Sequence, residues 1–244
     1  MLGLNGLKLH KYCICAFKMA ISRRYPVHLC MAYFIKTPWL LKKAYPTLVW
    51  DMPADDNAIY LTFDDGPHPQ ITPAVLKHLQ QYNAKATFFC IGNNVVNNPD
   101  VYKSIIDAGH TVANHTHNHL NGWKTKDAAY IDNIKQAAKH IQSNLFRPPY
   151  GRITKFQAKV LQSGANPYHI IMWNVLSGDF DIELTPQKCL DNVIKHTRPG
   201  DIVVFHDSEK AYPRMGFALS RGLEHFSKLG FVFKPIKPTA VTGK

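Results

Sequence analysis

Residues 59–67 read Ile-Tyr-Leu-Thr-Phe-Asp-Asp-Gly-Pro, and the first half of this stretch has the β-branched and aromatic composition of a buried strand. Asp64 and Asp65 follow, and then a Gly-Pro pair that ends the strand and turns the chain. Adjacent like charges in a partly buried place are unfavourable unless a cation compensates them. A metal ion would do so and leave one carboxylate free as a base, whereas an isolated Asp-Asp-Gly sequence is more often an exposed turn. Histidines at the same end of the fold would favour a metal site over an exposed turn.

The pattern of the remaining chain predicts a parallel α/β fold. Short apolar runs typical of strands alternate with segments whose apolar residues recur at helical spacing. The predicted strands are 58–63, 86–91, 111–114, 145–147, 170–173, 202–206 and 231–233, and the predicted helices are 73–82, 99–108, 126–142, 153–163, 186–196 and 217–229. Repeated strand–helix units imply a parallel sheet, and seven strands favour a barrel-like closure over an open sheet. Because no repeat or internal linker interrupts the chain, we expect one domain.

Capping and stop signals mark several helix boundaries. Three predicted helices open with a polar N-cap followed by proline: Thr72-Pro73, Asn98-Pro99 and Thr185-Pro186. Three close with a glycine, which suits the left-handed position after a helix: Gly109, Gly164 and Gly230.

The charge of the chain is concentrated at its N-terminus. The 244 residues are 45% hydrophobic and 19% charged, as in a globular protein with a core. Of the formal net charge of +12, most comes from residues 1–50, which hold eight Lys or Arg and no acid. The other 21 basic residues face all 17 acidic ones, a net charge of only +4. This distribution favours a solvated tail, or one that contacts an anionic envelope surface, over a nucleic-acid-binding domain.

Residues 1–30 predict neither a transmembrane span nor a convincing secretory signal, because basic residues interrupt every apolar run. We therefore expect a cytoplasmic or peripheral protein. A start at Met31 is an alternative that would make residues 1–30 a dispensable extension. The five cysteines, Cys13, Cys15, Cys30, Cys90 and Cys189, lack a disulfide spacing and are expected to be reduced, with the last two as small buried hydrophobes.

Unusual polar clusters stand where the predicted strands end. In a parallel barrel these ends meet at one rim, where working residues collect. The clusters are Asp64-Asp65, His-Thr-His-Asn-His (115–119), Arg-Pro-Pro-Tyr-Gly (147–151), Trp173 leading into Ser-Gly-Asp-Phe (177–180), and His206-Asp207.

His115 and His119 are four residues apart, so on a helical turn their imidazoles would lie one above the other and could hold one ion. His117 would then point to the far side, where it would either support the ligands from behind or face solvent. Together with Asp65 they form a two-His, one-carboxylate set that leaves coordination positions for water and substrate. Zinc is the expected ion, although such a set also takes other divalent transition metals. A surface histidine pair is the alternative.

Arg147 and His206 acquire possible roles from this site. A rigid Arg-Pro-Pro at the rim can hold Asp64 by charge-assisted hydrogen bonds, although it would otherwise be read as a surface turn. His206 ends a strongly apolar strand and suits a general acid opposite a metal-activated water, with a half-buried structural histidine as the alternative.

Five segments stand in the order seen in polysaccharide deacetylases, and the chain resembles that family over roughly residues 58–235. They are TFDDGP (62–67), HTxxH (115–119), RPPYG (147–151), WNVLSGDF (173–180) and VVFHD (203–207). The family is also described as the NodB-homology domain and as carbohydrate esterase family 4. The resemblance implies a distorted (β/α)7-type barrel of parallel strands, an α/β fold, that removes N- or O-acetyl groups from sugars with one divalent metal ion.

The resemblance also implies roles for single residues. Asp64 corresponds to the catalytic base, and Asp65, His115 and His119 correspond to the metal ligands. Arg147 resembles the residue that orients the base.

Further roles concern the leaving group and the sugar. The backbone N–H of Tyr150 resembles the oxyanion-hole donor, and Asp179 the partner that tunes the catalytic His206. The expected substrate-binding residues are Trp173, Val204 and Pro148, with Val204 where the family often has a leucine that lines the acetyl pocket. Phe180 and Asn174 depart from the family, which has tryptophan and commonly an acidic residue there, and we expect both at the wall around the sugar.

The expected function is metal-assisted hydrolysis of an N-acetylated glycan or amino sugar. A second possible function is that of a deformylase or cyclic-amide hydrolase on the same scaffold. A third is that of an inactive glycan-binding module. The complete set of base, ligands and acid argues against the third. We expect an extension and lead-in at 1–57, the deacetylase domain at 58–235 and a tail at 236–244.

Overall fold

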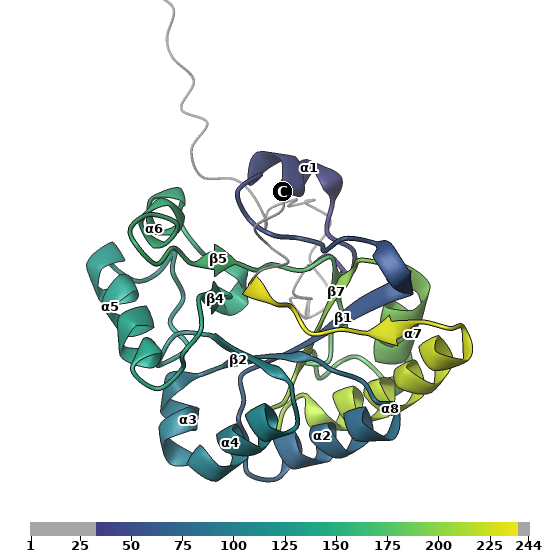
Figure 1. Cartoon of the computed structure of the whole chain (residues 1–244). Helices are drawn as coiled ribbons and strands as arrows, with labels where there is room; N and C mark the ends of the chain where they lie inside the picture. Colours follow the sequence, from purple (N-terminus) through teal and green to yellow (C-terminus); the bar gives the residue numbers. More distant parts are fainter. Residues whose placement is uncertain (1–32, 239–244) are drawn as a thin grey trace, which may run out of the picture. The chain divides into compact units, whose positions relative to one another are not determined.

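Eight strands and eight α-helices follow one another along residues 33–238, the part of the chain that the structure, a computed structural model, describes (Figure 1). In chain order they are α1 (Trp39–Ala44), β1 (Ala58–Asp64), α2 (Ile71–Gln81), β2 (Thr87–Cys90), α3 (Gly92–Asn97), α4 (Pro99–Asp107), β3 (Thr111–Asn114), α5 (Asp127–Ala138), β4 (Leu145–Phe146), α6 (Lys155–Leu161), β5 (His169–Ile170), β6 (Val175–Leu176), α7 (Pro186–His196), β7 (Ile202–His206), α8 (Tyr212–Lys228) and β8 (Val232–Phe233). Two 3₁₀ turns, η1 (Asp55–Asn57) and η2 (Pro149–Gly151), precede β1 and follow β4. Contacts divide the chain into two units, Met1–Phe34 and Ile35–Lys244, and all these elements belong to the second.

The sheet is parallel and curls round on itself. Its strand order is β5-β4-β3-β2-β1-β7-β6, and β8 pairs with β1 off this path. β5 and β6 stand at opposite ends of the order, yet only residues 171–174 separate them, which can span at most about 18 Å. A flat sheet of seven strands would be about 29 Å wide, so this one must curl. The predicted barrel-like closure is confirmed, as a distorted and partly open barrel.

The lead-in before β1 contributes to this closure. Lys36 bridges to Val175 of β6, and Val49 bridges to Ile171 just after β5. The backbone of Val49 exchanges hydrogen bonds with both neighbours of that residue, since its N–H donates to Ile170 and its carbonyl accepts from Met172. The lead-in therefore pairs with both ends of the sheet.

β1 lies at the centre of the sheet and separates two cores, because successive residues of a strand face opposite sides. Leu61 and Phe63 pack into the core beneath the surrounding helices, whereas Tyr60 packs into a second core inside the curl. Thr62 and Asp64 share the parity of Tyr60 and so face the interior. Asp64 thus stands inside the barrel at the carboxyl end of its central strand.

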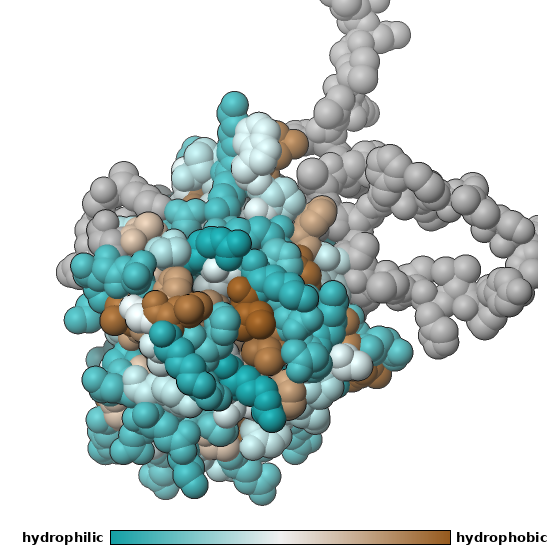
Figure 2. Space-filling view, turned by 90° about the vertical axis from the view of Figure 1, so that its right-hand side faces the viewer, coloured by the Kyte–Doolittle hydropathy of each residue, from teal (hydrophilic) through white to brown (hydrophobic). Residues whose placement is uncertain are grey.

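Helices cover the outside of the sheet. Neighbouring helices contact one another in the order α6, α5, α3, α4, α2, α8, α7, as Figure 1 shows. Figure 2 views the molecule from the side of α7 and α8, where hydrophilic side chains predominate and apolar ones form small groups. No helix within residues 33–238 is long and apolar enough to cross a membrane.

All seven predicted strands and all six predicted helices are present, although α8 begins at Tyr212, five residues before the predicted start. The elements that the sequence did not predict are α1, α3 and β6. α1 and α3 are six residues long, too short for a helical pattern to register, and β6 follows β5 after only four residues, so the pattern does not separate these two strands.

The capping signals were partly right. Thr185 caps α7 by accepting a hydrogen bond from the N–H of Lys188 at 3.1 Å, as predicted. Thr72 is not an N-cap, because α2 begins at Ile71 and Thr72 is buried within its first turn. Gly109 and Gly230 both adopt a φ of 76° just after their helices.

Cys90 and Cys189 are buried free thiols, as the apolar pattern around them predicted. The other three cysteines and the proposed dispensable segment 1–30 lie outside the described residues.

Candidate metal-dependent active site

The base candidate Asp64 is held by a buried arginine. Nη1 of Arg147 donates to Asp64 Oδ1 and to Thr62 Oγ1, at 2.7 Å each. Nε and Nη2 donate to the backbone carbonyls of Ile171 and Met172 at 3.2 and 2.9 Å. Arg147 has no exposed surface; burial lowers its pKa and the adjacent carboxylate opposes that shift. The fixed guanidinium orients Asp64.

Asp65, His115 and His119 form the group that could hold a metal ion. Their candidate ligand atoms all lie within 4.8 Å of one another. Nε2 of His119 and of His115 lie 3.2 and 3.8 Å from Asp65 Oδ1, which brackets the roughly 3.4 Å between two ligands of a tetrahedral ion at about 2.1 Å. Asp65 Oδ1 is buried, and no group in residues 33–238 donates a hydrogen bond to it. An orphaned buried carboxylate oxygen facing two imidazoles fits a divalent cation.

The two histidines do not lie on a helical turn, so that expectation was wrong. Residues 115–119 form an irregular loop after β3, with φ of 64° at Thr116 and 55° at His119. Side chains hold the loop in place of a helix: Asn114 Oδ1 accepts from the N–H of Thr116 at 2.8 Å, and Asn133 Oδ1 from the N–H of His117 at 2.9 Å. His117 is buried and does not face solvent.

Partners on the far ring nitrogens orient both imidazoles. His115 Nδ1 lies 2.8 Å from the carbonyl oxygen of Arg147, and His119 Nδ1 lies 3.1 Å from the hydroxyl of Tyr150. This arrangement leaves each Nε2 to face Asp65. Burial lowers the pKa of His115 to about 4, against the opposing effect of nearby carboxylates, so its imidazole is neutral and its lone pair available. Burial raises the pKa of Asp65, but the surrounding histidines, His119 foremost, more than offset this and hold it below its usual range.

His206 ends β7 beside Asp64, its partner in the β1–β7 register. Its Nδ1 lies 2.7 Å from Asp179 Oδ1, and its backbone N–H donates to Asp179 Oδ2 at 2.7 Å. Burial lowers the pKa of His206, but Asp179, with smaller contributions from Asp65 and Asp64, more than offsets burial, and the net value rises to about 10. Arg214 of α8 holds the loop, since its Nε donates to the carbonyl of Asp179 at 2.7 Å. No sequence pattern predicted this contact. Phe180 packs edge-on against the imidazole, at 5.4 Å between ring centroids.

The predicted substrate-binding residues differ in their exposure. Tyr150 is 61% exposed and has a left-handed backbone with φ 59°, an unusual conformation for a bulky residue that tends to occur at functional sites. Trp173 is half-buried and packs so closely on Gly151 that a Cβ there would approach the indole to 2.6 Å. Val204 is buried two residues before His206 on the same face of β7, and Pro148 is buried.

Asp207 is a residue whose role the sequence did not reveal. Its carboxylate accepts from the N–H of Gly66 at 3.0 Å and from the hydroxyl of Thr72. A Cβ at Gly66 would clash with that carboxylate at 2.1 Å, so only glycine allows the approach. Burial raises the pKa of Asp207 to about 8, although its hydrogen bonds oppose the rise. The signal that could have found it is the Gly-Pro turn itself, which needs a buried partner for its N–H.

Asn174 does not lie at the sugar wall, so that expectation was wrong. Its side-chain amide donates to Asp201, which precedes β7 whereas His206 ends it. Asp201 also pairs with Lys36 at 2.6 Å. The missed strand β6 explains the error, because it places Asn174 before a strand and not after one.

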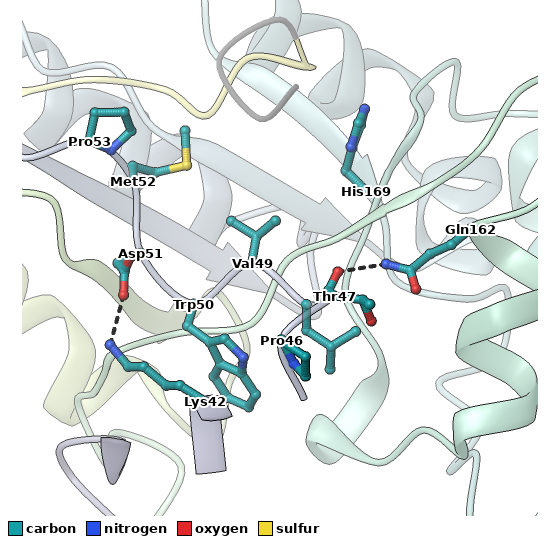
Figure 3. A pocket seen from close by; sticks show the side chains of 11 residues that line it. Lys42, Pro46, Thr47, Val49, Trp50, Asp51, Met52, Pro53, Gln162 and His169 are labelled. Carbon is teal, nitrogen blue, oxygen red and sulfur yellow. Dashed lines mark hydrogen bonds and ion pairs between the residues drawn. The ribbon is translucent and has the colours of Figure 1, made fainter. Parts of the chain in front are cut away.

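A cavity of about 380 Å³ lies away from this site (Figure 3). It is lined mainly by the lead-in, and His169, the first residue of β5, places it toward the amino ends of the strands. Lys42 pairs with Asp51 at 2.8 Å within it, and Gln162 donates to the carbonyl of Thr47 at 2.7 Å. None of the polar clusters of the rim lines this cavity, so we do not assign the active site to it.

A carboxylate free to accept a proton, a cation-binding group beside it and a charged imidazole on the next strand are the groups with which a metal-dependent hydrolase works. The family model described as polysaccharide deacetylase matches residues 51–166. A peptidoglycan-N-acetylglucosamine deacetylase of Bacillus cereus is 34% identical over 202 residues, which cover 80% of this chain and 94% of that protein. A chitooligosaccharide deacetylase of Bradyrhizobium sp. is 35% identical over 159 residues, which cover 62% of this chain and 71% of that protein.

A solved structure agrees with these similarities. The crystal structure of the Bc1960 peptidoglycan N-acetylglucosamine deacetylase, in complex with 4-naphthalen-1-yl-N-oxidanyl-benzamide, has a TM-score of 0.74 at 27% identity and covers 85% of this chain and 98% of that one. The chain therefore belongs to the polysaccharide deacetylase family. It is a metal-dependent hydrolase that removes acetyl groups from N-acetylated sugars.

Proposed function

We propose that this deacetylase acts on N-acetylglucosamine residues within a glycan chain, such as peptidoglycan or a chitooligosaccharide, with zinc held by Asp65, His115 and His119. The observation that carries the proposal is the convergence of Asp64, the three candidate ligands and His206 at the carboxyl ends of neighbouring strands. The substrates named for the similar Bacillus and Bradyrhizobium proteins support the choice of sugar.

The donor set favours zinc and a catalytic site. Two imidazoles and one carboxylate are ligands that zinc accepts, and three protein ligands leave a position for water or substrate. When bound, the ion polarises the acetyl carbonyl and lowers the pKa of a water molecule. The neutral His115 and the low pKa of Asp65 mean that neither group needs to lose a proton before binding at neutral pH.

Asp64 is the proposed general base. It stands next to Asp65 in the chain, yet its carboxylate is turned to Arg147 and is not a member of the metal-binding group. The guanidinium fixes the carboxylate in one orientation, from which it takes the proton of the attacking water.

His206 is the proposed general acid. Asp179 fixes the ring through Nδ1 and stabilises the charged imidazolium, so Nε2 carries the proton to the leaving amine. The bond from the His206 N–H to the same carboxylate holds the two residues in register.

The acetyl group is proposed to lie between Tyr150 and β7. The left-handed backbone of Tyr150 follows a rigid Pro-Pro turn, which suits an N–H that must be placed in advance to hold an oxyanion. Val204, below His206 on the inner face, would contact the acetyl methyl, and Trp173 and Pro148 would form the adjoining wall.

An acetate-release screen tests the proposal. We expect the purified protein with added zinc to release acetate from N-acetylglucosamine oligomers or peptidoglycan. Treatment with a chelator should abolish release, and zinc should restore it. Release of formate from an N-formyl substrate, or opening of a cyclic amide, without any acetate from the glycans would contradict the proposal and favour the other two chemistries.

A further inference from the structure

Two loops of the rim run side by side from the metal-binding group outward and present Tyr150, Arg152 and Trp123. We propose that these three side chains, the Trp123 ledge, bind the sugar next to the one that is deacetylated. This inference rests on the proposed function, because it requires a glycan chain as the substrate. It names a subsite that selects oligomers over single sugars.

Three contacts join the loops and place Trp123 near the site. His119 meets the hydroxyl of Tyr150 at 3.1 Å, next to the metal-binding group. Further along, the N–H of Gly122 donates to the carbonyl of Arg152 at 3.2 Å, and Trp123 Nε1 donates to the carbonyl of Ile153 at 2.9 Å. Since Tyr150 and Arg152 are two residues apart, their Cα atoms lie within about 7 Å. The ledge is therefore one neighbouring position away from the acetyl site.

The indole is exposed but held firmly. The side chain of Trp123 is 44% exposed although its N–H is satisfied. The guanidinium carbon of Arg152 lies 4.2 Å from its ring centroid and covers one face. A sugar ring would therefore pack on the face of the indole that Arg152 does not cover. A ring held in advance loses little entropy on binding.

The backbone beneath the ledge allows little movement. A Cβ at Gly122 would lie 2.5 Å from the carbonyl oxygen of Arg152 and 2.7 Å from Oε1 of Gln157, so the loops approach as closely as glycine permits. Nε2 of Gln157 donates to the carbonyl of Gly122 at 2.9 Å and to Asp127 at 2.8 Å. Such support from a buried side chain is what a fixed binding surface requires.

The chemistry of the ledge matches a sugar ring. A pyranose has C–H groups on its faces, which pack on an aromatic ring, and hydroxyls at its edge. Arg152, partly exposed beside the indole, offers N–H donors for those hydroxyls. Tyr150, 61% exposed, continues the surface toward the acetyl site.

The test compares substrate lengths in the full-length, metal-loaded protein. Acetate release is measured on N-acetylglucosamine itself and on its oligomers of two to five residues. For Trp123→Ala we expect kcat/KM on the tetramer to fall about three- to tenfold, mainly through KM, the size of one aromatic contact. Hydrolysis of the single sugar, which cannot reach the ledge, should change less than twofold. Trp123→Phe should retain most of the advantage of longer oligomers.

Trp39→Ala is the matched control, because Trp39 of α1 is 70% exposed and distant in sequence from the rim. It should leave every rate unchanged, and metal content should be equal in all variants. As a second measurement, tryptophan emission of the metal-free wild type is titrated with the pentamer. The change in emission should be clearly smaller in Trp123→Phe, in which Trp173 at the wall of the acetyl site is the remaining tryptophan of the proposed binding surface.

Three results would overturn the inference. They are an unaltered length dependence in Trp123→Ala, an equal loss on the single sugar and on every oligomer, which would indicate a purely structural tie between the loops, and an emission change as large in Trp123→Phe as in the wild type. The first two leave the proposed function intact, since the glycans are still deacetylated. A wild type that releases acetate from no glycan would instead refute the proposed function and this inference with it.

Discussion

An aspartate–cation pair lies at each end of the neighbouring strands β1 and β7. The two pairs differ in their burial and in their further hydrogen bonds. At the carboxyl end, Arg147 donates to Asp64 at 2.7 Å, and the two side chains are 0% and 5% exposed. At the amino end, Lys36 donates to Asp201 at 2.6 Å, and the lysine is 37% exposed. Distance alone would make the pairs equivalent.

The difference lies in what remains unsatisfied. Asp201 also accepts from the side chain of Asn174 and from the N–H of Arg198, so both its carboxylate oxygens are occupied. In residues 33–238, Asp64 receives side-chain hydrogen bonds from Arg147 alone, and the adjacent Asp65 has a buried oxygen with no donor. Buried polar groups are normally satisfied, and an orphan costs about 1–3 kcal/mol. A closed network stabilises the fold, whereas an open one leaves acceptors for a metal ion and a proton.

The largest expected effect comes from breaking the open network. His119→Ala removes one of the three candidate metal ligands, and we expect loss of the metal and a fall in turnover of about a thousandfold or more. Metal analysis and acetate release on the same preparation check this. Full metal with full activity would show that the ion is held elsewhere.

Removal of either cation sharpens the comparison. Arg147→Ala leaves Asp64 buried without its partner, so we expect a loss of about 3–5 kcal/mol in the free energy of unfolding together with most activity. Lys36→Ala is the matched change at the other end. Because Lys36 is partly solvated, it should cost about 1 kcal/mol at most and leave kcat/KM of the folded protein unchanged. Urea unfolding of both variants gives the two values, and equal losses would contradict the distinction.

A smaller effect is expected in the pH dependence of the His206–Asp179 pair. The pKa of His206 rises from 6.5 to about 10, so the protonated acid persists until the pH approaches that value. Its stabilising contribution is complete below pH 6.5 and is lost as the pH rises through about 10. Asp179→Asn removes the charge that raises the pKa, so the alkaline limb of kcat/KM should move by about one pH unit or more to lower pH. An unmoved limb would refute the pairing as a catalytic device.

The smallest effect is predicted for removal of residues 1–30. The unit Ile35–Lys244 contains every described element, so a chain beginning at Met31 should keep its melting temperature and its activity. The same truncation removes five of the eight basic residues before position 51 and should weaken binding to vesicles of anionic lipid. A clear drop in melting temperature would show that the segment belongs to the fold.

Much of the fold was predictable because local patterns sufficed. Apolar strands of four to seven residues and helices of nine or more carry enough repeats to be recognised, as β1 and α7 illustrate. β6 has two residues and lies four residues after β5, so nothing in the sequence separated the two strands. Because β6 was not predicted, Asn174 was expected at the carboxyl end of a strand, whereas it lies just before the amino end of β6.

The positions of site residues could be predicted where the residues end a strand. They were harder to predict where the residues lie in a loop. Asp64 and His206 end paired strands, so their proximity follows from register. The loop that brings His115 and His119 together uses left-handed residues and the buried amides of Asn114 and Asn133, which no spacing rule encodes. The contacts of Asp207 and Arg214 span 141 and 35 residues and depend on tertiary packing alone.

The proposed mechanism makes Asp64 a free base beside a metal ion that its neighbour Asp65 binds. It is tested most directly by measuring metal content and acetate release together on Asp64→Asn, which preserves shape and removes the charge. We expect about one metal equivalent per chain, as in the wild type, with turnover reduced about a hundred- to ten-thousandfold. Loss of the metal along with the activity would show that Asp64 is a metal ligand and would contradict its proposed role as the base.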